Sequence, residues 1–160
     1  MVYFSPSDEQ PLNSSSEAGF SLLELMIVVA IVGVAVMLAL PDMLRSSAQS
    51  RLKQQAQELR TNMSMARMSA VNRNTTVTVS MAIVGGVVEA SFGGVLPVQR
   101  MHPEIKSFGG PTQIRFNSYG MLAGVATNQT ITLTNSQGVT QAVQVTPGGK
   151  VRWCQTSTCT

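Results

Sequence analysis

The stretch that decides the fold runs from Gly19 to Pro41 and reads GFSLLELMIVVAIVGVAVMLALP. Its apolar part, Phe20 to Leu40, spans 21 positions, and Glu24 is the single charged residue among them. At a rise of about 1.5 Å per residue, a helix of this length extends about 31 Å, which is enough to cross the hydrocarbon core of a bilayer. The sequence therefore predicts a transmembrane helix over residues 20–41.

Glu24 is the unusual feature of this helix. A carboxylate among lipid tails costs roughly 2.5–3.5 kcal/mol, so the side chain needs a partner. One candidate is the free amine that a cut between Gly19 and Phe20 would produce. A secretory signal peptide would have a basic front and a shorter apolar core, and a plain membrane anchor would not explain Glu24.

A small residue, Phe, three apolar or small residues, Glu and a long apolar run together resemble the class III signal of type IV prepilins. The resemblance implies that residues 1–19 are a leader, that a membrane peptidase cuts after Gly19, and that the enzyme methylates Phe20. It implies that Glu24 pairs with the terminal amine of a neighbouring subunit in a filament. The expected location is the inner membrane, with one span, a periplasmic domain and assembly into a pilus at the cell surface.

The charge pattern of the chain favours a membrane orientation opposite to the one that a periplasmic domain requires. The leader carries three acidic residues and no basic one, whereas four basic residues follow the apolar run: Arg45, Arg51, Lys53 and Arg60. The positive-inside rule places such a basic flank in the cytoplasm. Either the prepilin signal overrides this bias, or the true start of the chain differs.

Composition limits the rest of the chain to one small domain. Removing 19 of the 160 residues leaves 141. The formal charge of the whole chain is +3. Without the three acids of the leader, 11 basic and five acidic side chains remain, a balance of +6. A basic exported domain suggests an anionic partner such as nucleic acid or lipid head groups.

Residues 42–72 have the pattern of an amphipathic helix. Apolar residues recur at spacings of three and four, which predicts one buried stripe: Ala48, Leu52, Ala56, Leu59, Met63, Ala66 and Ala70. The small residues on this stripe favour packing on a sheet over a free-standing coiled coil. The helical pattern continues through Pro41, so we expect one long helix with a kink there.

Residues 73–160 change to a period of two, which indicates strands. Val77, Val79, Met81 and Ile83 are expected to face one way, and 87–92 is a candidate returning strand. Further alternation follows around Ile114, Ile131 and Val143, whereas the glycine- and proline-rich stretch 93–112 is expected to be a long loop. The predicted fold class is α+β, with a long kinked N-terminal helix packed on a small antiparallel sheet.

The sequence contains no constellation of residues typical of an enzyme, a cofactor site or a metal site. No nucleophile–base pair, carboxylate pair or phosphate-cradling glycine loop stands out, and the one histidine, His102, is expected to be an exposed loop residue. Cys154 and Cys159 are expected to form a disulfide in an oxidising periplasm, with two free thiols as the alternative. Two cysteines and one distant histidine do not complete a zinc site.

The stretch SRLKQQAQELRTNMSMARMSAVNRNTTVTVS, residues 50–80, resembles the FimT/GspH branch of pilins and pseudopilins. QIRFNSYG (113–120) and TPGGKVRWC (146–154) are similar to later blocks of that branch, and 82–112 is not. The resemblance implies the type IV pilin-like fold. Many members have a cysteine where this chain has Ser80, so a disulfide using that site is absent here.

FimT-type minor pilins bind DNA in natural transformation through a Gly-Arg-x-Arg motif, which Gly149-Lys150-Val151-Arg152 resembles. On a strand, Lys150 and Arg152 share one face and project two cations toward phosphate. Arg115, on an outward face, and the loop residues Arg100 and Lys106 are candidates to widen the patch. A solvated strand face is the alternative interpretation. The resemblance also allows a GspH-like pseudopilin of a type II secretion system, or a minor pilin that primes assembly.

Overall fold

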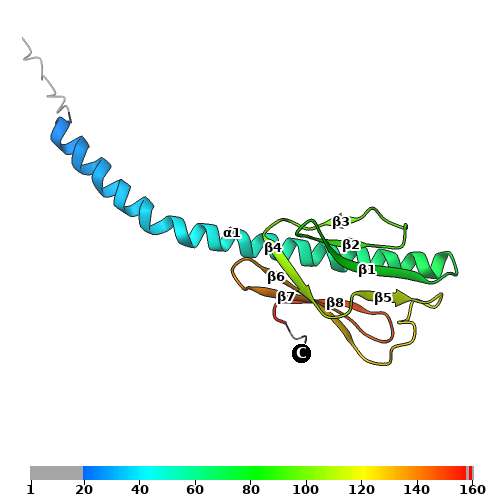
Figure 1. Cartoon of the computed structure of the whole chain (residues 1–160). Coiled ribbons are helices and arrows are strands. Elements are labelled where there is room, and N and C mark those ends of the chain that lie inside the picture. Colours follow the sequence, from blue (N-terminus) through cyan, green and yellow to red (C-terminus); the bar gives the residue numbers. More distant parts are fainter. Residues whose placement is uncertain (1–19, 158, 160) are drawn as a thin grey trace, which may run out of the picture. The chain divides into compact units, whose positions relative to one another are not determined.

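The computed structural model describes residues 20–157 and 159, apart from the side chains of 38–44 (Figure 1). The leader, residues 1–19, and with it Gly19 of the predicted cleavage site, lie outside the described residues. The chain divides into two compact units, Met1–Leu40 and Pro41–Thr160, which are considered one at a time.

Helix α1, Leu22–Asn72, is assigned without interruption through Pro41. Glu24 lies in its first turn, and the side chains of residues 20–37 are exposed in the isolated chain. The described part of α1 does not combine the length and the hydropathy that a membrane span requires. The predicted span, 20–41, includes positions 38–41, whose side chains are not among the described ones. The predicted kink at Pro41 stays a prediction.

The amphipathic stripe of α1 is confirmed within the second unit. All seven of its predicted members are buried, and most belong to the central core. The helix ends at Asn72, as the sequence indicates, and Asn74 follows with a positive φ of 49°. This left-handed conformation is one that asparagine tolerates better than most residues, so the chain turns sharply into the first strand.

The strands form two antiparallel sheets, where the sequence predicted one. The first has the order β3-β2-β1-β5 and consists of β1 (Val77–Val84), β2 (Val87–Ser91), β3 (Gln99–Arg100) and β5 (Gln113–Phe116). The second has the order β4-β6-β7-β8 and consists of β4 (Ile105–Gly109), β6 (Gln129–Asn135), β7 (Thr140–Val145) and β8 (Val151–Cys154). The chain passes from the first sheet to the second at β4, returns to the first at β5, and enters the second again at β6.

Three further expectations were wrong. The stretch 93–112 is not one long loop, because β3 pairs with β2 and β4 forms an edge of the second sheet. Ile83 is exposed, unlike Val77, Val79 and Met81, because it lies near the tip of the β1–β2 hairpin, where the strand extends beyond the core. Alternation is confirmed around Ile114 and Ile131, where Ile114, Phe116, Ile131 and Leu133 are buried. It is not confirmed around Val143, because the residues of β7 from Gln141 to Val145 are all buried.

One core joins the helix to both sheets. It contains Leu59 and Met63 from α1, Phe116 from the first sheet, and Leu133 and Val145 from the second. The fold class is therefore α+β as predicted, a long N-terminal helix packed on antiparallel strands. Because α1 packs against the second sheet, it lies near β8, which is an edge strand.

A cationic groove between α1 and β8

The basic segment of residues 149–152 leads into the edge strand β8. Lys150 and Arg152 are exposed, Val151 is buried and Trp153 is half-buried, which is the alternation expected of a strand with one face on the core. The two cations therefore lie on the same side of the segment. Their role in DNA binding stays a prediction.

Both cations line one groove of about 530 Å³ between β8 and α1. The strand and the turn before it contribute Lys150, Val151, Arg152 and Trp153 to its lining, and the helix contributes Gln57, Arg60 and Thr61. Arg60 thus shares the groove with the two basic residues of the motif, although 90 positions separate it from Lys150 in the sequence.

The groove carries positive charge that no acidic residue of its lining offsets. Among the described residues, the ion pairs of arginine or lysine with a carboxylate are Arg51 with Glu104 and Arg100 with Glu89. None of the three groove cations takes part in them. An anion that enters the groove therefore does not have to displace an internal carboxylate.

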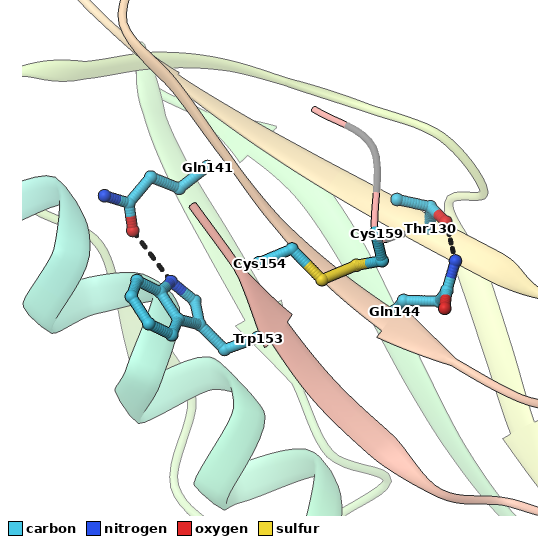
Figure 2. Close-up of a disulfide and its surroundings, with 6 residues drawn as sticks. All are labelled: Thr130, Gln141, Gln144, Trp153, Cys154 and Cys159. Carbon is cyan, nitrogen blue, oxygen red and sulfur yellow. Dashed lines mark hydrogen bonds between the residues drawn. A yellow bond between two sulfur atoms is a disulfide. The ribbon is translucent and has the colours of Figure 1, made fainter. Parts of the chain in front are cut away.

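Trp153 forms part of the wall and is held by two contacts, of which Figure 2 shows the one with Gln141. Its Nε1 donates a hydrogen bond to Oε1 of Gln141 on β7 at 2.8 Å. The Nζ of Lys53, on α1, lies 5.4 Å from the centroid of the ring, within the range of a cation–π contact. These contacts fix the indole between the helix and the sheet.

Gly149 sets the position of Lys150. Its φ is 79°, and a Cβ at this position would collide with the backbone oxygen of Gly120 and lie 2.7 Å from Nε of Arg67. The turn is closed by a hydrogen bond from the Gly149 N–H to the Thr146 carbonyl at 2.8 Å. Glycine is required here because the backbone passes so close to the loop after β5.

The structure does not bring the other predicted cations into the groove. Arg115 lines a separate hollow with Gln113 and residues of the β5–β6 loop. Arg100 is bonded to Glu89 at 2.6 Å, and Lys106 lies on β4, at the opposite edge of the sheet from β8. The expectation that these residues widen the patch around β8 is not supported by their positions, because they belong to other strands.

Sequence reasoning missed the contribution of the helix. Lys53, Gln57 and Arg60 are spaced four and three positions apart, so they lie on one face of α1. This spacing was visible in the sequence. Nothing in the sequence alone indicated that β8 packs beside that face.

The disulfide between Cys154 and Cys159 is present in the structure, and it joins β8 to the residues that follow it. Figure 2 shows it on the side of β8 away from the helix, as expected for the residue after Trp153. His102 lies in the loop between β3 and β4, as expected, its side chain is 40% exposed, and its Nε2 lies 3.2 Å from Nη1 of Arg51. No cluster suited to a metal ion occurs among the described residues.

Comparisons with known proteins cover most of the chain. The family described as type II transport protein GspH matches residues 55–149, and the prokaryotic N-terminal methylation motif matches residues 14–40. No curated protein matches the sequence.

Two crystal structures of the type IV minor pilin FimU of Pseudomonas aeruginosa are similar to this chain. The first has 14% identity and a TM-score of 0.49, and the match covers 64% of this chain and 91% of that one. The second has 15% identity and a TM-score of 0.46, and the match covers 65% of this chain and 88% of that one.

The GspH match alone extends over more than half of the chain, and the methylation motif coincides with the stretch that contains Phe20 and Glu24. The helix and the antiparallel sheets agree with the pilin-like fold implied by the sequence. The protein therefore belongs to the GspH family, described as type II transport protein GspH, and carries the prokaryotic N-terminal methylation motif.

Proposed function

We propose that this chain is a minor pilin of a type IV pilus that binds extracellular DNA in the groove between α1 and β8, for uptake in natural transformation. The observation that carries the proposal is that Lys150 and Arg152 line one groove whose lining contains no carboxylate. The net positive charge outside the leader supports an anionic ligand.

Recognition in such a groove rests on phosphate. The interactions of lysine and arginine with the DNA backbone are independent of sequence and weaken as salt rises, because binding releases counterions. Lys150 supplies a point charge where arginine would supply two parallel donors, so this chain has a weaker form of the motif. Duplex DNA of any sequence is the expected ligand.

The proposal includes the N-terminal half of the chain. Cleavage after Gly19 exposes the amine of Phe20, which the prepilin peptidase methylates, and Glu24 pairs with this amine on a neighbouring subunit. Residues 20–41 then anchor the subunit in the inner membrane before assembly with other major and minor pilins. The match of residues 14–40 to the methylation motif supports this part.

A titration of labelled duplex DNA with the full chain in a non-ionic detergent tests the function. We expect binding at low salt, with log K falling linearly against log salt concentration. Changing Lys150 and Arg152 together to Gln is expected to remove most of the binding. It should also reduce the slope by about 1.8, since each phosphate that the protein no longer neutralises accounts for about 0.9.

The matched control removes two other exposed charges, Lys106 and Arg73, in the same way. Lys106 lies on β4, the far edge strand of the second sheet, and Arg73 follows the end of α1. This control is expected to bind DNA nearly as well as the wild type. An equal decrease in both variants would mean that net charge, and not the groove, determines binding.

The match to GspH favours a second candidate, a pseudopilin of a type II secretion system. That role, like a minor pilin that only primes assembly, would use α1 and the sheets without DNA. Deleting the gene separates these candidates. Loss of transformation with normal protein secretion and normal piliation supports the DNA-binding pilin, loss of the pili themselves supports the priming pilin, and loss of secretion supports the pseudopilin.

A further inference from the structure

Arg60 is an exposed arginine on α1, and its side chain has no bonding partner among the described residues. Its guanidinium forms no hydrogen bond and no ion pair among them. Arg51 and Arg67, on the same helix, are in contrast bonded to Glu104 and to the Gly120 carbonyl. A long cationic side chain held on a rigid helix without such a partner is available to a ligand.

Two independent observations place the side of α1 that carries Arg60 opposite β8. The first is that Arg60 lines the groove together with Lys150 and Arg152. The second is the contact of Lys53 with the Trp153 ring, because Lys53 lies two turns before Arg60 on the same face of the helix. Arg60 therefore approaches the groove from the wall opposite the basic motif.

We infer that Arg60 is a phosphate-binding residue, so that the site holds a nucleic-acid backbone between a helix and a strand. The inference rests on the proposed function and extends it from the two cations of the motif to a third one on another element. The guanidinium is a planar fork that matches two phosphate oxygens, which the ammonium of Lys150 does not. Arg60 thus supplies a two-pronged interaction that Lys150 does not provide.

The surroundings of Trp153 favour recognition of the backbone over base stacking. Base stacking needs an accessible ring face, as in proteins that bind single strands. Here one face of the indole is covered by Lys53, and Nε1 is bonded to Gln141. Trp153 acts as a wall of the groove, and the ligand class is the phosphodiester backbone of duplex DNA.

Single substitutions in the full chain in detergent test the inference, with labelled duplex DNA as the probe. We expect Arg60→Gln to weaken binding about three- to tenfold and to lower the slope of log K against log salt by about 0.9. Arg60→Lys keeps the charge, so its slope is expected to match the wild type. The control, Arg45→Gln, removes an exposed arginine about four turns earlier on α1 and should change neither quantity.

The single tryptophan provides a second readout that reports on the place of binding. Quenching of Trp153 fluorescence by acrylamide should decrease when DNA fills the groove. The Arg60→Gln variant should require more DNA to reach the same protection of Trp153 from quenching. Thermal unfolding of each variant checks that the fold is retained, which we expect because Arg60 has no described internal partner.

The outcomes separate this inference from the function on which it rests. If Arg60→Gln binds like the wild type while the Lys150 and Arg152 variant does not bind, the inference is wrong and the proposed function stands. If the wild type does not bind DNA, both are wrong. Binding to vesicles of phosphatidylglycerol instead of DNA would likewise overturn both and assign the groove to lipid head groups.

Discussion

Arg67 donates a hydrogen bond from Nε to the backbone oxygen of Gly120 at 2.7 Å, and this bond ties α1 to the loop after β5. Gly149 packs against the same two groups. The helix, the β5–β6 loop and the turn before β8 therefore meet at one point. The position of Lys150 relative to α1, and with it the shape of the groove, depends on this junction.

Gly149→Ala is expected to destabilise the protein by about 1–3 kcal/mol, because alanine would adopt a left-handed conformation and its Cβ would strike the Gly120 carbonyl. Urea unfolding measures the change. DNA affinity should fall as well, since the turn must shift. Gly148→Ala is the control: nothing lies within 4 Å of a Cβ there, so stability should stay within about 0.5 kcal/mol. Equal stability of the two variants would contradict this explanation.

Arg67→Leu is expected to lower the free energy of unfolding by about 1.5–3 kcal/mol, because it removes a charge-assisted hydrogen bond and leaves the Gly120 carbonyl without this donor. Arg67 does not line the groove, so the salt dependence of DNA binding should keep its slope. Arg73→Leu, at an exposed position, should leave the melting temperature unchanged. A stable Arg67 variant would show that the hydrogen bond contributes little.

Gln141→Leu is expected to lower the free energy of unfolding by about 1 kcal/mol, because Nε1 of Trp153 loses its hydrogen-bond acceptor. The emission of Trp153 should change in the folded state. Gln144→Leu is a matched control on the same strand, since it removes the bond to Thr130 at 3.3 Å, shown in Figure 2, without touching the indole. The same change in emission for both variants would refute the assignment.

Lys150→Arg is expected to tighten DNA binding about two- to fivefold, because guanidinium binds phosphate through two parallel hydrogen bonds. The salt slope should not change, as the charge is retained. Lys106→Arg, on the far edge of the sheet, should have no effect on affinity. A similar gain from both substitutions would argue against a specific interaction at Lys150.

The sequence predicted those features that depend on local periodicity. The buried stripe of α1 from Ala48 to Ala70 follows from a period near 3.6, and the burial of Ile114, Phe116, Ile131 and Leu133 follows from a period of two. The pairing of Cys154 with Cys159 is also local, because four intervening residues form only a short loop. Each of these depends on a few neighbouring residues.

Only the tertiary structure decided which elements lie next to one another. Alternation gives a strand its two faces but not its hydrogen-bonding partners, so the sequence did not reveal two sheets or the return of β5 to β1. For the same reason periodicity places Arg60 off the buried stripe of α1 without showing what it faces. The face of an element on which a residue lies is set by its neighbours in the chain, but the surface opposite that face is set by the packing of the whole core. That packing placed Arg60 opposite Lys150 and Arg152.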